Sequence, residues 1–160
     1  MEAPGSKGGV EMKKILIVDD DQGIRMLYAY ELAKEGYEVT TCGDGSRVME
    51  SIKNERPDLV VMEIRLGKYD GLDLLQEIRN ACEELPVIIC TAYPSLRHDL
   101  SSVAADDFLL KNLDLKELKL KIERAFERRK MTIPVGFHCT MGQAKTNVSR
   151  QTDVPWKSAH

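Results

Sequence analysis

Short, uninterrupted apolar runs separated by segments of helical periodicity constrain this chain more than any other feature. The runs are KILIV (14–18), DLVVM (58–62), PVIIC (86–90) and DFLL (107–110), and YEVTT (37–41) is a further strand-like segment. Continuous runs of Val, Ile and Leu are typical of strands that are buried on both faces of a sheet. The sequence therefore predicts five strands.

Between these runs, apolar residues recur every three or four positions, which is typical of amphipathic helices. Gly36 would end the first helix, Pro94 occupies the position favoured for a first helical residue, and Asp114 with Glu117 forms a capping-box-like pair at the start of the last helix. The five predicted helical segments are 21–36, 45–55, 71–84, 94–104 and a last one that begins at Asp114.

Strands and helices that alternate with short connections require a parallel sheet with right-handed crossovers. We therefore predict an α/β fold, a three-layer, doubly wound, five-stranded parallel sheet. The periodic pattern supports one domain over residues 13–128, preceded by a flexible extension (1–12) and followed by a disordered tail (129–160). A docking role for Trp156 in that tail is the alternative.

Composition limits the possible partners and the compartment. The net charge of -3 gives no sign of a nucleic-acid surface. The N-terminus has no signal-peptide core and no stretch approaches about 18 apolar residues, so neither secretion nor membrane insertion is expected. The four cysteines form no C-x-x-C pair, which favours reduced thiols and a cytoplasmic location.

Polar residues follow the predicted strands at the points where those strands end. In open α/β sheets, ligands bind outside the carboxyl ends of the strands. Carboxylates gathered there repel one another, and Mg²⁺ is a usual remedy because it prefers carboxylate oxygens and often shares its remaining positions with a phosphoryl group. A hydroxyl and an ammonium would hold the other phosphoryl oxygens. The candidates are Asp19, Asp20 and Asp21 after the first strand, then Glu63, Thr91 and Lys111.

Four segments in order, ILIVDDD, PDLVVMEIRLGKYDGLDLL, VIICTAY and ADDFLLK, resemble the receiver domains of two-component response regulators over roughly residues 13–128. The resemblance implies a flavodoxin/CheY-like strand order of 2-1-3-4-5. It also implies a Mg²⁺ site at Asp19, Asp20, Glu63 and the backbone carbonyl of Arg65. Thr91 and Lys111 take the family's catalytic hydroxyl and lysine positions, and Thr91 and Phe108 its switch positions.

Glu63 stands where this family has the aspartate that accepts a phosphoryl group. Its extra methylene would push the carboxylate toward the cation and Lys111, which is expected to cripple transfer. The same charge lies part of the way toward that of an aspartyl phosphate. Partial mimicry of the phosphorylated state, a silent receiver and residual phosphorylation remain as three alternatives.

Two further departures concern the surroundings of the pocket. Asn112 stands where the family commonly has a proline with a cis peptide, so a trans bond and an altered approach of Lys111 are expected alternatives. Gly67 lies in the loop after the acceptor position, where the family's usual proline is missing, and we expect a looser loop.

The resemblance predicts a non-enzymatic single-domain signalling module. Its partners would be a sensor histidine kinase or phosphotransfer protein and a downstream protein target, with no nucleic acid and no membrane. Two other classes share the fold. A flavodoxin-like cofactor binder would need a Gly/Ser/Thr-rich phosphate loop where this chain has DDDQG, and a metal-dependent phosphohydrolase would turn over phosphate esters.

Overall fold

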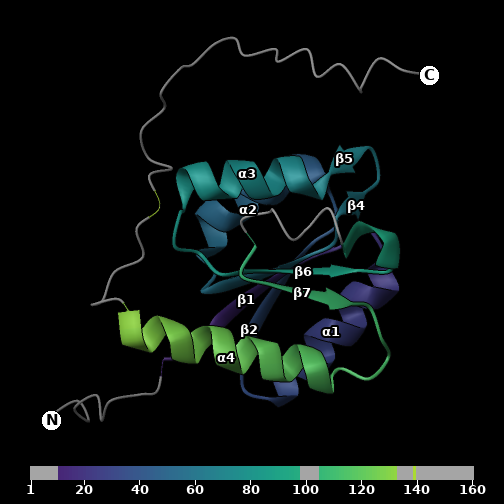
Figure 1. Cartoon of the computed structure of the whole chain (residues 1–160). Coiled ribbons are helices and arrows are strands. Elements are labelled where there is room, and N and C mark those ends of the chain that lie inside the picture. Colours follow the sequence, from purple (N-terminus) through teal and green to yellow (C-terminus); the bar gives the residue numbers. More distant parts are fainter. Residues whose placement is uncertain (1–10, 98–104, 133–138, 140–160) are drawn as a thin grey trace, which may run out of the picture.

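A five-stranded parallel sheet forms the centre of the computed structural model, which describes residues 11–97, 105–132 and 139 (Figure 1). The strands are β1 (Lys14–Val18), β2 (Glu38–Cys42), β3 (Leu59–Met62), β6 (Val87–Thr91) and β7 (Asp107–Leu110). Their order in the sheet is β2-β1-β3-β6-β7, and each neighbouring pair is parallel. The predicted α/β class and the predicted strand order are confirmed.

Helices cover both faces of this sheet and complete three layers. Figure 1 shows α2 (Val48–Glu55) and α3 (Gly71–Ala81) above the sheet, and α1 (Gln22–Lys34) and α4 (Lys116–Thr132) below it. A 3₁₀ turn, η1 (Gly45–Arg47), precedes α2. None of the helices in the described ranges is long and apolar enough to cross a membrane.

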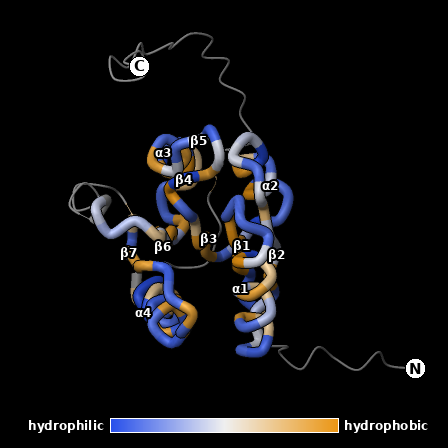
Figure 2. The backbone as a smooth tube through the Cα atoms, turned by 90° about the vertical axis from the view of Figure 1, so that its right-hand side faces the viewer, coloured by the Kyte–Doolittle hydropathy of each residue, from blue (hydrophilic) through white to orange (hydrophobic). Residues whose placement is uncertain are grey.

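Side chains of the central strands alternate between two cores. On β1, Leu16 and Val18 pack with α2 and α3, whereas Ile15 and Ile17 pack with α1 and α4. Successive side chains of a strand point to opposite faces, so a strand buried on both faces has no polar positions. This explains the uninterrupted apolar runs. The hydropathy colouring of Figure 2 shows these strands between the two outer layers of helices.

The two C-terminal helical predictions need correction. Pro94 opens η2 (Pro94–Arg97), a 3₁₀ turn, and the rest of the helix predicted over 94–104 lies outside the described residues. The last helix, α4, begins at Lys116. Asp114 accepts a hydrogen bond from the Lys116 N–H at 3.0 Å, but its own N–H donates to Asn112 Oδ1 at 3.2 Å. The predicted capping box was therefore wrong, because the Asp114 N–H donates to Asn112 and not to Glu117.

The segment after β3 is more regular than the loop that we predicted. Two short antiparallel strands, β4 (Arg65–Leu66) and β5 (Tyr69–Asp70), form a hairpin around Gly67. Gly67 has a φ of 60°, which glycine adopts without the strain that a Cβ would introduce. The glycine therefore permits a tight turn instead of loosening the segment.

The prediction of four reduced cysteines was wrong, because a disulfide joins Cys82 to Cys139. Cys42 and Cys90 are free and buried. Neither partner carried a pairing signal, since 57 residues separate them and the residues around Cys139 show no periodic pattern. Residues 129–132, predicted as the start of a disordered tail, are the last residues of α4 instead. Most of the remaining extension and tail (1–10, 133–138 and 140–160) lies outside the described residues, so its disorder stays a prediction, as does docking of Trp156.

Candidate functional site

Four of the predicted site residues lie at the carboxyl edge of the sheet, where four neighbouring strands end. Asp19 and Glu63 come directly after β1 and β3, Thr91 is the last residue of β6, and Lys111 follows β7. Parallel strands end at a common edge, so residues far apart in the sequence meet there. Asp19, Glu63 and Thr91 are the buried polar side chains of the described residues.

Lys111 joins the two buried acids. Its Nζ atom lies 2.5 Å from Asp19 Oδ2 and 2.8 Å from Glu63 Oε2. Asp19, Glu63 and Lys111 are called the acid–lysine cluster below. One ammonium therefore contacts two carboxylates that are almost fully buried. The Lys111–Asn112 peptide bond is trans, so Lys111 reaches the acids without the cis bond that is common in the family.

The second oxygen of Glu63 binds the backbone of its own loop. Glu63 Oε1 accepts hydrogen bonds from the N–H groups of Ile64 at 2.7 Å and Arg65 at 3.3 Å. Both oxygens of the carboxylate are therefore engaged, one by an ammonium and one by two amides. Arg65 thus contributes its N–H to the site, whereas the metal-binding role predicted for its carbonyl stays a prediction.

Gly71 holds the backbone of this loop against the start of α3. Its N–H donates to the Ile64 carbonyl at 2.5 Å. A Cβ at this position would lie 2.6 Å from the Glu63 carbonyl oxygen and 2.7 Å from Ile64 Cα. Only glycine fits this close approach, so the position of the Glu63 backbone depends on the missing side chain at residue 71.

Asp19 is fixed on both sides. Its Oδ1 accepts from the Asp21 N–H at 2.9 Å, and its carbonyl accepts from Arg25 Nη1 at 2.7 Å. Burial raises the pKa of the Asp19 carboxyl, and the hydrogen bond from Lys111 opposes that rise. Burial also acts to lower the pKa of Lys111, but the hydrogen bonds to Asp19 and Glu63 outweigh it and leave that pKa raised. The lysine stays protonated.

Asp20 and Asp21 do not join this cluster. Asp20 Oδ2 accepts from the Gly67 N–H at 3.1 Å in the β4–β5 turn, and Asp21 caps α1 by accepting from the Ile24 N–H at 3.1 Å. Among the described residues there is no group of three or more His, Cys, Asp or Glu side chains that could hold a metal ion. In the described conformation, Lys111 lies between Asp19 and Glu63, and Asp20 binds the β4–β5 turn instead.

Thr91 and Phe108, the predicted switch residues, lie on the adjacent strands β6 and β7. Thr91 Oγ1 accepts from the Tyr93 N–H at 3.3 Å, and the Thr91 carbonyl accepts from the Lys111 N–H at 2.8 Å. Phe108 is half-buried against the core on the α2/α3 face. The Arg65 guanidinium lies over the Tyr93 ring, 4.1 Å from its centroid, and so connects the Glu63 loop to the Thr91 loop.

A polar pair under the site was missed from the sequence. The Tyr28 hydroxyl of α1 lies 3.5 Å from Cys90 Sγ of β6, and both side chains are buried. Burial raises the pKa of the Cys90 thiol to about 11 and raises that of the Tyr28 hydroxyl as well. Helical spacing placed Tyr28 on the inner face of α1, but it did not reveal its partner.

A parallel α/β sheet with two acids and a lysine at its carboxyl edge is the arrangement expected of the receiver domains that this chain resembles. The model of the response regulator receiver domain matches residues 15–123. The chain belongs to this family, which acts in two-component signal transduction. Of the three classes of protein considered from the sequence, the receiver domain is therefore the one that this chain belongs to.

Curated relatives are similar over the same region. The alkaline phosphatase synthesis transcriptional regulatory protein PhoP of Bacillus subtilis is 30% identical over 124 residues, which cover 76% of this chain and 52% of PhoP. Response regulator MprA of Mycobacterium sp. (strain KMS) is 35% identical over 118 residues, covering 72% of this chain and 51% of MprA. The chain thus spans about half the length of these relatives.

Solved structures support the same assignment. The response regulator TrrA of Thermotoga maritima, in complex with Mg²⁺–BeF, is 38% identical with a TM-score of 0.68 and covers 71% of this chain and 99% of TrrA. TrrA in complex with the histidine kinase ThkA gives 38% identity and a TM-score of 0.66, covering 71% of this chain and 98% of TrrA.

Proposed function

We propose that this chain is a cytoplasmic receiver module in which Glu63 gives a phosphorylation-deficient and partially phosphomimetic state. The observation that carries this proposal is the occupation of both Glu63 oxygens, by Lys111 at 2.8 Å and by the Ile64 N–H at 2.7 Å. A phosphoryl acceptor needs a carboxylate oxygen placed in line with the donor phosphorus, and these contacts fix the position of both Glu63 oxygens.

The charge of the acid–lysine cluster explains why the mimicry is partial. Glu63 places a permanent negative charge beside Lys111, as a phosphoryl group on an aspartate would. Thr91 Oγ1, however, is engaged by the Tyr93 N–H of its own loop. A population shift is only as large as the differential contacts of the two states. The Glu63 carboxylate contacts Lys111 but not Thr91 Oγ1. It should therefore shift the equilibrium between the inactive and signalling states less than a phosphoryl group would.

The Mg²⁺ predicted from the sequence has a more limited place in this proposal. Asp19, Asp20 and Glu63 are the residues that would hold it, and there it would offset the charge of a phosphoryl group. Because Lys111 already lies between two of these acids, we propose that this chain binds Mg²⁺ weakly.

The proposed partners are proteins. TrrA, which is 38% identical to this chain, was solved together with the histidine kinase ThkA. We propose that a histidine kinase or phosphotransfer protein docks at the carboxyl edge of the sheet, and that the output surface comprises β7 and α4. Leu110 of β7 and Leu120 and Met131 of α4 are large apolar residues that these two elements leave exposed.

The test is phosphoryl transfer to this chain and to its Glu63→Asp variant. Both proteins are incubated with Mg²⁺ and acetyl phosphate, and their intact masses are measured. In the variant the carboxylate is one methylene shorter, so we expect it to leave Lys111 and gain one phosphoryl group. The unmodified chain is expected to gain none.

Glu63→Gln is the matched control, since it keeps the length of the side chain and removes its charge. It is expected to take no label, and a partner that binds the unmodified chain should bind this variant more weakly. Equal labelling of the unmodified chain and Glu63→Asp would refute the proposed deficiency. No label on Glu63→Asp would refute the assignment of this pocket as an acceptor site.

A further inference from the structure

The Cys82–Cys139 disulfide lies at the opposite edge of the sheet from the acid–lysine cluster. Cys82 follows the last residue of α3, and its N–H donates to the Ile78 carbonyl at 2.6 Å. Its side chain is part of the core on the α2/α3 face, and Cys139 packs against that core. Cys82 is 1% exposed, whereas Cys139 is only half-buried.

The bond closes a long covalent loop around one half of the sheet. The two cysteines are 57 residues apart, and the segment between them contains β6, β7 and α4. Thr91 is the last residue of β6, and Lys111 directly follows β7. Helix α4 ends at Thr132, and Cys139 follows seven positions later. Residue 139 is therefore attached to the end of α3, on the other side of the sheet from α4.

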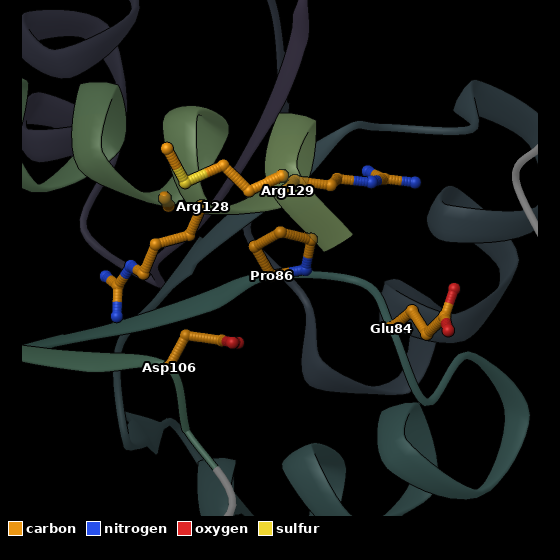
Figure 3. Close-up of a pocket in the computed structure, with 7 residues that line it drawn as sticks. Glu84, Pro86, Asp106, Arg128 and Arg129 are labelled. Atoms are coloured by element: carbon orange, nitrogen blue, oxygen red, sulfur yellow. The ribbon is translucent and has the colours of Figure 1, made fainter. Parts of the chain in front are cut away.

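A cavity of about 480 Å³ lies at the same edge, between the end of α4 and the starts of β6 and β7 (Figure 3). Figure 3 shows the Pro86 ring between the α4 ribbon and Asp106. One end of the lining, Met131, is the penultimate residue of α4, and the other, Glu84, is two residues after Cys82. The disulfide therefore lies close in sequence to one border of this cavity, because Cys82 precedes Glu84 by two residues.

We propose that Cys82 and Cys139 form a reversible thiol–disulfide site, a redox latch that attaches residue 139 to the end of α3. The oxidant is a small disulfide of the glutathione class. The Cys139 thiolate attacks one sulfur of that disulfide and releases one small thiol. The Cys82 thiolate then attacks Cys139 Sγ and releases the second. The two protein thiols lose two electrons and two protons, which the small disulfide gains.

The difference in exposure sets this order of attack. Cys139 is the accessible partner, and the buried Cys82 resolves the mixed disulfide, because attack by or on a thiol requires access. Reduction runs through the same steps in reverse. Cys42 and Cys90 are also buried but are free, so they are spectators.

Closing the redox latch stabilises the folded chain. A disulfide restricts the unfolded chain more as the loop it closes grows longer. Oxidation attaches residue 139 to the end of α3, and it does so independently of the chemistry of Glu63.

The experiment equilibrates the full chain in buffers of reduced and oxidised glutathione, blocks free thiols with iodoacetamide, and measures intact mass. The reduced chain should carry four adducts and the oxidised chain two, with Cys82 and Cys139 linked in a peptide map. In urea, the unfolding equilibrium constant of the oxidised chain should be about 10- to 1,000-fold smaller.

Cys139→Ser should abolish the dependence of the urea midpoint on redox state. Cys42→Ser is the control that should retain it, because a hydroxyl can replace the Cys42 thiol that donates to the Asp44 carbonyl at 3.2 Å. Four adducts at every glutathione ratio, a bond between other cysteines or between two chains, or equal midpoints for both redox states would each overturn the redox latch. So would a disulfide that dithiothreitol cannot reduce in the folded chain.

Discussion

The Arg65 guanidinium lies over the face of the Tyr93 ring, 4.1 Å from its centroid. Arg65 also donates its backbone N–H to Glu63 Oε1, and Tyr93 donates its own to Thr91 Oγ1. The stacked pair thus connects the backbone groups that bind the acid of β3 to those that bind the hydroxyl of β6. A cation over an aromatic ring is attracted by the charge distribution of that ring.

The first prediction concerns this stacked pair. A double-mutant cycle of Arg65→Ala and Tyr93→Ala, measured by urea unfolding, should give a coupling free energy of about 0.5–1 kcal/mol, as expected for an exposed cation–π pair. Tyr93→Phe keeps the ring and should retain most of the coupling. Strict additivity of the two alanine substitutions would show that the pair contributes nothing to stability.

Gly71→Ala should displace the loop that carries Glu63. The new Cβ would meet backbone atoms at 2.6 to 2.9 Å, and backbone cannot yield as a flexible side chain can. We expect a loss of about 1–3 kcal/mol in the free energy of unfolding, as for other overpacked sites.

Gly23→Ala is the matched control for this substitution, because Gly23 also lies in the first turn of a helix. Its added Cβ would approach only Asp21 Oδ1, at 3.2 Å. The free energy of unfolding of this variant should lie within about 1 kcal/mol of that of the unmodified chain, since alanine is more favourable than glycine in a helix by about that amount. Equal losses for both glycines would assign the effect to the helix start instead of to the Glu63 loop.

These contacts also show how far the sequence could predict the molecule. Strand order and the meeting of Asp19, Glu63 and Lys111 were predictable, because residues that directly follow buried parallel strands must share one edge. The position of Asp20 was not. It follows Asp19 in the sequence, yet it binds the Gly67 N–H of a hairpin that forms 47 residues away. A motif identifies residue types at a strand end, but the neighbouring turn decides where each one points.

Contacts between residues far apart in the chain could not be predicted from the sequence where no local pattern marks them. Neither the disulfide of Cys82 nor the contact between Tyr28 and Cys90 leaves a periodic signal, since each depends on two elements packing at one particular distance. The capping-box prediction at Asp114 failed for a local reason. Asn112, which replaces the family's usual proline, offers an acceptor closer in sequence than Glu117.

Removing the ammonium of the acid–lysine cluster should destabilise the fold and strengthen cation binding. Lys111→Met leaves the carboxylates of Asp19 and Glu63 buried without a counter-charge, and breaking such a pair costs about 3–5 kcal/mol. The urea midpoint of Lys111→Met should rise with added Mg²⁺ more than that of the unmodified chain.

The double variant Lys111→Met/Glu63→Gln tests the cause of that loss. It removes one of the two uncompensated charges, so it should recover part of the lost stability and respond less to Mg²⁺. If Mg²⁺ raised the midpoint of the unmodified chain as much as that of Lys111→Met, the competition between lysine and cation would be excluded.

The buried thiol of Cys90 makes stability depend on pH in the alkaline range. Burial raises the pKa of this thiol from 9.0 to about 11, while its hydrogen bond with Tyr28 opposes the rise. Between these two pH values the unfolded chain has lost the thiol proton and the folded chain still holds it. The ionisation of this thiol alone therefore lowers the stability of the folded state as the pH rises through this window, by about 2 kcal/mol at pH 11.

Cys90→Ala isolates this contribution, because alanine has no proton to lose. At pH 8 the variant should be less stable than the unmodified chain, since it leaves a small cavity beside Tyr28. That difference should shrink by about 2 kcal/mol when urea unfolding is repeated at pH 11. A difference that stays constant from pH 8 to pH 11 would mean that the Cys90 thiol ionises equally in the folded and unfolded chains.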